Sequence, residues 1–192
     1  GFKNYDSLEI LEEVSEKNNA MSSRVKGNGK KILLLHFGGT IASKVDYETG
    51  GVSAKYTPEE LINQYPEINE ICNLDCKVVG NYSSEDLTYN EINSLSEIIH
   101  SNLALYDGFI VTHGTDTMHY TAMSLSFSLE NLSKPVVLTG AQRSSDRSSS
   151  DAFMNLQNSV NWINQCIPGV VLCMHSSVND DNCLIIDGLH AR

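Results

Sequence analysis

The chain has 192 residues, of which 41% are hydrophobic, and a formal net charge of -11. This length suits one α/β domain, which can bury about 70% of the surface that its unfolded chain exposes. The acidic charge argues against direct binding to a nucleic-acid backbone. The sequence has no apolar run long enough for a membrane span and no hydrophobic segment typical of a secretion signal. We therefore expect no direct membrane binding and a cytoplasmic location.

Five cysteines at irregular spacings indicate reduced thiols rather than a disulfide framework. Cys72 and Cys76 form a C-x3-C pattern, but no second pair of ligands with similar spacing follows it. We therefore interpret these cysteines as buried thiols and not as a zinc site.

The N-terminal part differs in character from the rest of the chain. Residues 6–17 have apolar positions at helical spacing, and a polar, small-residue stretch follows them. We predict an N-terminal helix and linker over residues 1–30 and an α/β domain over residues 31–192. Because the chain starts at Gly1 and stops after "IIDGLHAR", we expect a fragment cut at both ends, with the α/β domain truncated at its C-terminal end.

Strand and helix signals alternate after residue 30. Capping boxes mark two helix starts, one at Thr57 and Glu60 with Pro58 between them, the other at Thr88 and Glu91. The predicted strands are 31–37, 76–82, 107–113, 135–140, 169–175 and 182–187, and the later predicted helices are 88–102, 117–130 and 150–165. Mostly apolar strands that alternate with helices predict a parallel sheet with helices on both faces.

Polar residues follow four successive strands of this predicted sheet. In an open parallel sheet, binding sites form at the carboxyl ends of the strands. The residues at those ends are 38–40, 83–86, 114–117 and 142–147, which supply hydroxyls and carboxylates. No G-x-G-x-x-G or P-loop pattern follows any strand, and the histidines show no metal-binding pair on a helix. A nucleotide-binding protein is therefore the weakest of the alternatives.

The remaining chemistry is that of a hydroxyl nucleophile. Thr40 follows Gly38 and Gly39, and Thr115 follows Gly114, so both hydroxyls can be presented beside backbone amides. For a single such loop, a tight turn with N-capping is the favoured explanation. Two hydroxyl loops at neighbouring strand ends, together with carboxylates, bring the nucleophile hypothesis level with it. Glu85 and Asp116 suit an α-ammonium group, and a solvated loop is the alternative for Glu85. A small zwitterionic amino acid with a side-chain carbonyl is the ligand that such a site would suit.

Four motifs together resemble the asparaginase/glutaminase family of two-threonine amidohydrolases. They are "GGTIAS", "THGTDTMHYTA", "KPVVLTGAQR" and "SSDAFMNL". The longer run "GAQRSSDRSSSDAFMNL" is most similar to the branch of the family that forms glutaminase subunits of archaeal tRNA-dependent amidotransferases. The resemblance covers nearly everything from Lys30 to Arg192, and it implies an asparaginase-like N-terminal α/β domain.

The resemblance also implies roles for individual residues. Thr40 would be the nucleophile, and Thr115 with Asp116 would form the second half of the catalytic apparatus, paired with a lysine. Ser84 and Glu85 match the substrate-binding pair of the family, with Asp116 also facing the α-amino group. Residues 43–56 correspond to a mobile lid, whose tyrosine is assigned to Tyr47, with Tyr56 as the alternative.

Two departures from the family pattern are expected to matter. Phe37 stands where the family usually has threonine, which predicts altered packing around the nucleophile loop. The family's lysine is expected just after Arg192, and its smaller C-terminal domain and the N-terminal β-barrel of the closest branch lie outside the sequence. We therefore expect the 192-residue piece alone to be inactive or nearly so.

The resemblance implies that the intact protein releases ammonia from glutamine through an acyl-threonine intermediate. A tRNA-binding partner, the E subunit of the amidotransferase, would use this ammonia to convert Glu-tRNA(Gln) to Gln-tRNA(Gln). ATP and Mg would bind to that partner, with no cofactor in this chain, and the glutaminase subunit itself would form a homodimer. The alternatives are a stand-alone L-asparaginase or glutaminase and a non-catalytic ligand-binding or assembly domain. The preference for glutamine or asparagine as substrate stays open.

Overall fold

A mixed sheet covered by helices forms the body of the protein. The computed structural model describes residues 24–25, 29–45, 52–54, 60 and 63–192. The strands of its main sheet are β1 (Arg24–Val25), β2 (Lys31–Gly38), β5 (Asn73–Tyr82), β6 (Gly108–Thr112), β7 (Pro135–Thr139), β8 (Gly169–His175) and β9 (Cys183–Asp187). The helices are α2 (Ile68–Ile71), α3 (Tyr89–Asn102), α4 (Met118–Ser128) and α5 (Ala152–Asn164).

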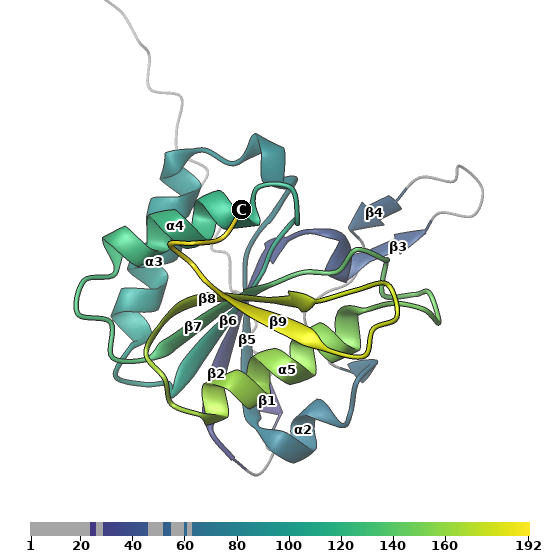
Figure 1. Ribbon diagram of the computed structural model, residues 1–192. Coiled ribbons are helices and arrows are strands. Elements are labelled where there is room, and N and C mark those ends of the chain that lie inside the picture. Colours follow the sequence, from purple (N-terminus) through teal and green to yellow (C-terminus); the bar gives the residue numbers. More distant parts are fainter. Residues whose placement is uncertain (1–23, 26–28, 46–51, 55–59, 61–62) are drawn as a thin grey trace, which may run out of the picture.

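The central strand β2 is buried on both faces, as its continuous apolar sequence predicts. Leu33, Leu35 and Phe37 point to one face of the sheet, where they pack against residues of α3 and α4. Ile32 and Leu34 point to the other face, where they pack against α5 and α2. The predicted arrangement of helices on both faces is therefore confirmed (Figure 1).

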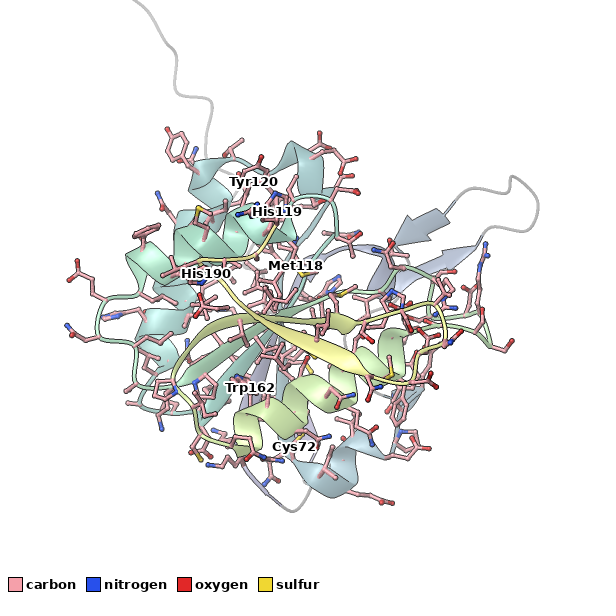
Figure 2. The ribbon with its side chains drawn as sticks, in the orientation of Figure 1. Cys72, Met118, His119, Tyr120, Trp162 and His190 are labelled. Atoms are coloured by element: carbon pink, nitrogen blue, oxygen red, sulfur yellow. The ribbon has the colours of Figure 1, made fainter. Side chains whose placement is uncertain are left out.

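The labelled side chains show the two layers directly. Met118 of α4 lies on one side of the sheet, whereas Trp162 of α5 and Cys72, just after α2, lie on the other (Figure 2). Helix α3 begins with the predicted capping box, in which Thr88 and Glu91 exchange hydrogen bonds with each other's backbone. The helix start predicted at Thr88 is thus confirmed.

Strand order places a crevice beside β2. Within the described residues, the seven-stranded sheet has the order β1-β5-β2-β6-β7-β8-β9, and β5, β2, β6, β7 and β8 run parallel. The chain leaves β2 for its neighbour β5 and then returns to β6 on the opposite side of β2. This reversal is a topological switch point, at which the loops after β2 and β6 diverge and leave room for a ligand.

The connection through α5 has the opposite hand to the other three. The step from β2 to β5 runs one way along the sheet over the face of α2, and the steps from β5 to β6 and from β6 to β7 run the other way over the face of α3 and α4, so these three connections have the same hand. The step from β7 to β8 runs in the same direction as the step through α4, but α5 covers the opposite face. Because parallel crossovers are right-handed in about 98% of cases, the α5 connection is the left-handed one. It brings the loop between β7 and α5 against the turn after β2, where Ile41 packs with Ala141 and Ala152.

The structure corrects several sequence predictions at the edges of the sheet. The sheet is not parallel throughout, because the edge strands β1 and β9 are antiparallel to their neighbours. The predicted linker over residues 1–30 contributes β1, so the sheet recruits two residues from before the predicted boundary. Strand β5 starts at Asn73 rather than at residue 76.

The segment predicted to be a lid contains two short antiparallel strands, β3 (Ser43–Val45) and β4 (Val52–Ala54). The predicted helix over residues 6–17 and the helix start at Thr57 and Pro58 lie outside the described residues. Near that start, the backbone N–H of Gln64 donates to the Glu60 carbonyl at 3.2 Å, as in a helical turn. None of the helices within the described ranges is long and apolar enough to cross a bilayer.

Candidate active site

The turn after β2 needs two glycines because it passes between two other backbones. Gly38 and Gly39 have φ angles of +126° and +94°, in the region that other residues rarely adopt. A Cβ on Gly38 would lie 2.2 Å from the Tyr82 carbonyl oxygen, and one on Gly39 would lie 2.5 Å from the His113 carbonyl. The glycines therefore let β2 end tightly against β5 and β6, and Thr40 follows directly in a short 3-10 turn, Thr40–Ala42.

A cavity of about 340 Å³ opens at this point, above the carboxyl ends of β2, β5 and β6. Its lining residues are Gly39, Thr40, Asn81, Tyr82, Ser83, Ser84, Glu85, Gly114, Thr115 and Asp116. Five of the predicted site residues thus share one cavity, although up to 76 residues separate them in the sequence. The sixth, Tyr47, lies outside the described residues, as does the alternative Tyr56.

Both substrate-binding candidates lie in a short 3-10 turn after β5, Ser84–Asp86. The Ser84 hydroxyl donates to the Glu85 carboxylate at 3.4 Å. The pKa of Glu85 is lowered by hydrogen bonds from its own backbone amide, from the Ser83 hydroxyl and from the Ser84 hydroxyl. Glu85 is therefore an anion at neutral pH and can attract a cationic group in the cavity.

Strand β5 contains a bulge before it reaches this turn. His36 of β2 pairs with Val78, whereas Gly38 pairs with Tyr82, so β5 contains two more residues than β2 between the same two pairings. Such bulges bend a strand and redirect its side chains, and they are common beside active sites. Ser84 and Glu85 follow this bulge and line the cavity together with Thr40.

His113 fixes the backbone that precedes Thr115. One ring nitrogen lies 2.8 Å from the Thr121 hydroxyl and the other 2.7 Å from the Gly114 carbonyl oxygen. Burial lowers the pKa of His113, against the smaller opposing effect of the Gly114 carbonyl. The imidazole is therefore neutral at pH 7 and serves as a structural support between β6 and α4.

Phe37, for which the sequence predicted altered packing, contacts Tyr82, which lines the cavity. Its side chain is buried and makes an edge contact with the Tyr82 ring, at 5.1 Å between centroids, and a tilted contact with His113 at 5.7 Å. Tyr82 and Asn81 also line the cavity, which the sequence analysis missed because both fall inside the predicted strand 76–82. No sequence signal distinguishes them from ordinary strand residues.

The polar residues after β7 have a different role from the one that their position predicted. None of residues 142–147 lines the cavity described above. Instead, the buried Asp151 carboxylate accepts hydrogen bonds from the backbone N–H groups of Gln142 and Arg143, both at 3.0 Å. Ser145 donates to the Ile41 carbonyl, one residue after Thr40. This strand end therefore contacts and supports the turn that carries Thr40.

The cysteines and histidines form no metal site in the described part of the chain, where no group of three possible ligands converges. Cys72 and Cys76 are buried, as predicted, whereas among the other cysteines Cys173 is buried, Cys183 is half-buried and Cys166 is exposed. Burial raises the pKa of the Cys72 thiol to about 12, which keeps it protonated and unreactive at neutral pH.

The fold and the two threonine loops are typical of one protein family, and comparison with known sequences identifies the same family. The sequence profile described as "Asparaginase, N-terminal" matches residues 31–188. The chain belongs to the asparaginase family. Its N-terminal α/β domain accounts for the sheet, for both helical layers and for the switch-point cavity.

Similar proteins fall into two groups within this family. The chain is 45% identical to the D subunit of glutamyl-tRNA(Gln) amidotransferase from Archaeoglobus fulgidus, over 100% of this chain and 46% of the relative. It is 40% identical to the protein of the same name from Methanosphaera stadtmanae, over 90% of this chain and 39% of the relative. The chain thus spans less than half the length of these curated relatives.

The second group consists of solved structures. The thermostable L-asparaginase from Thermococcus kodakarensis matches with a TM-score of 0.71 and 29% identity, over 82% of this chain and 46% of that one. L-asparaginase I from Vibrio cholerae matches with a TM-score of 0.65 and 33% identity, over 74% of this chain and 44% of that one. These likenesses agree with the observed parallel core and its helical layers.

Proposed function

We propose that the protein hydrolyses the side-chain amide of glutamine and releases ammonia. The observation that carries this proposal is the convergence of two threonine turns with Ser84, Glu85 and Asp116 on one cavity at the switch point. A hydroxyl nucleophile and an anionic subsite for an α-ammonium group are the two elements that hydrolysis of a free amino-acid amide requires.

In the proposed reaction, the Thr40 hydroxyl attacks the amide carbon of the substrate. The proton of the hydroxyl passes to the amide nitrogen, ammonia leaves, and an acyl ester on Thr40 remains. Water then cleaves the ester to give glutamate and regenerates the hydroxyl. Thr115, with Asp116 beside it, belongs to the proton-transfer half of the site, together with the lysine that the family resemblance predicts after Arg192.

The substrate is held by its α-amino and α-carboxylate groups. Glu85 and Asp116 attract the α-ammonium, and the Ser84 hydroxyl donates to the α-carboxylate, so that the side-chain amide points toward Thr40. Tyr47 is our choice for the residue that closes the lid over the substrate.

We further propose that the ammonia serves a tRNA-dependent amidotransferase. Support comes from the two relatives described above, which are named as subunits of a glutamyl-tRNA(Gln) amidotransferase. In this proposal a homodimer of the protein acts in the cytoplasm with the E subunit. This partner binds tRNA, ATP and Mg and converts Glu-tRNA(Gln) to Gln-tRNA(Gln). The net charge of -11 suits a protein that leaves tRNA binding to its partner.

The second candidate function is that of a stand-alone L-asparaginase or glutaminase. It is favoured by the two solved structures described above, both of which are L-asparaginases. The two functions require the same cavity and differ in whether amide hydrolysis depends on a tRNA-binding partner.

Ammonia release from glutamine and from asparagine tests the proposal in the full-length protein, with and without the partner and misacylated tRNA. We expect glutamine hydrolysis that rises when both are added and that disappears in Thr40→Ala. Fast, partner-independent hydrolysis would favour the stand-alone enzyme. Full activity of Thr40→Ala would exclude the acyl-threonine mechanism and favour a non-catalytic role for this cavity.

A further inference from the structure

We propose that Thr117 is a positioning residue that holds the Ser84–Glu85 turn in its substrate-binding position. Its hydroxyl donates to the backbone carbonyl of Ser84 at 2.7 Å, across 33 residues of sequence. Thr117 does not line the cavity, so it acts through Ser84 rather than on the substrate. The predicted effect on KM rests on the proposed function, whereas the predicted effect on the position of the Ser84–Glu85 turn does not.

The unusual use of the Thr117 hydroxyl supports this role. Threonine at the N-cap of a helix normally accepts a hydrogen bond from a backbone N–H of the first turn. Thr88 does so at the start of α3, where its hydroxyl accepts from the Asn90 N–H. Thr117 holds the same position before α4 and makes no side-chain capping bond. Its hydroxyl is used for a long-range contact instead, at the expense of local helix stabilisation.

Ser84 is confined from two sides at this contact. Its side chain is buried, and a Cβ on Gly114 would lie 2.7 Å from the Ser84 hydroxyl oxygen, so the loop after β6 touches it closely. On the backbone side, the Ser84 carbonyl accepts from Thr117 and more distantly from the Leu87 N–H at 3.4 Å. The loop after β6 therefore supplies both the packing surface and the anchor.

The anchor joins the two sides of the switch point. Ser84 and Glu85 follow β5, whereas Thr115, Asp116 and Thr117 precede α4 and follow β6. One hydrogen bond thus fixes the substrate-binding turn relative to the second threonine turn. Its loss should loosen the grip on the α-amino and α-carboxylate groups and leave the reacting hydroxyls in place, which affects KM more than kcat.

The test compares Thr117→Val, which keeps the shape and removes the donor, with Thr117→Ser, which restores it. Both are made in the full-length protein. We expect Thr117→Val to raise KM for glutamine up to about tenfold, the scale of one hydrogen bond, with kcat changed less than twofold. Thr117→Ser should return KM to within about twofold of the wild type. Amide hydrogen exchange over residues 83–87 should be faster in Thr117→Val only.

Thr139→Val is the matched control, because the Thr139 hydroxyl also donates to a backbone carbonyl, that of Cys173, at 2.8 Å. It should lower stability similarly and leave KM and the exchange of residues 83–87 unchanged. Unchanged exchange in Thr117→Val, or an equal KM effect in Thr139→Val, would overturn the inference. If the wild-type protein hydrolyses neither amide, the proposed function fails, and the exchange comparison still decides the role of Thr117.

Discussion

At the scale of single residues, buried polar groups determine the geometry of the site. His113 is 1% exposed and contacts both α4 and the turn that carries Thr115. An unfolded histidine titrates near pH 6.5, whereas burial lowers the pKa of folded His113. Below about pH 6.5 the unfolded state therefore binds a proton that the folded imidazole resists, and folding becomes less favourable as the pH falls.

We predict that stability falls between pH 7 and pH 5 and that His113→Gln weakens this dependence. Urea unfolding of the full-length protein across this range measures the effect. His190→Gln is the control, since the His190 side chain is 81% exposed. An unchanged pH dependence in His113→Gln would contradict the assignment of a buried neutral imidazole.

The sequence predicted which candidate residues share the cavity better than it predicted the residues that support them. Thr40, Ser84, Glu85, Thr115 and Asp116 stand directly after strands, and such positions converge in any parallel sheet. Thr117 was predicted to lie at a strand end and to start a helix, but its contact with Ser84 was not predicted, because its partner is 33 residues away and no local pattern records a tertiary hydrogen bond. The places of Tyr82 and Asn81 in the cavity lining depend on the β5 bulge. A bulge is a property of strand pairing, which no local pattern records either.

At the scale of secondary-structure elements, the turn after β2 is the most constrained part of the fold. Gly39 combines a positive φ with a close approach to the His113 carbonyl, so any side chain there must displace one of two strand ends. Thr40 follows immediately and would move with it. Small displacements of a nucleophile lower turnover strongly, because attack requires near-contact geometry.

We predict that Gly39→Ala lowers kcat by about 100-fold or more, measured as ammonia release by the folded variant. Gly169→Ala is the matched control: its φ is also positive, at +129°, but a Cβ there would meet nothing within 4 Å. It should cost about 1 kcal/mol of stability and leave kcat unchanged. Equal losses of kcat in both variants would indicate general strain rather than displacement of Thr40.

Most elements could be predicted, and the exceptions have a common cause. Apolar runs and capping boxes located the central strands and α3, since both signals are local. Strands β1, β3 and β4 were missed because they are two or three residues long and exist through pairing with a neighbour. The antiparallel direction of β9 likewise follows from its short connection to β8, not from its composition.

At the scale of the whole molecule, the left-handed α5 connection links the edge of the sheet to the Thr40–Ala42 turn. Asp151 is fully buried at the N-terminus of α5 and also accepts a hydrogen bond from the Asn155 amide at 2.9 Å. Arg143 lies 3.7 Å from Asp151 and pairs with Asp180 in the loop between β8 and β9. His175 and Arg143 together lower the pKa of Asp180, in that order of importance.

We predict that Asp151→Ala destabilises the protein by about 3–5 kcal/mol, because it leaves Arg143 and two backbone N–H groups without their buried partner. Denaturant unfolding of the full-length protein measures this loss. Asp187→Ala is the control, since its pair with His190 is exposed and should contribute less than about 1 kcal/mol. A loss below about 1 kcal/mol in Asp151→Ala would mean that packing alone holds the crossover loop.

The central claim is that Thr40, presented by Gly38 and Gly39, takes up the acyl group. The most direct measurement is to react the full-length protein with a diazoketone analogue of glutamine and to map the covalent adduct by peptide mass spectrometry. We predict an adduct on the peptide that contains Thr40, protection by excess glutamine, and no adduct in Thr40→Ala. Labelling that persists in Thr40→Ala, or that maps to Thr115 in the wild type, would contradict the account.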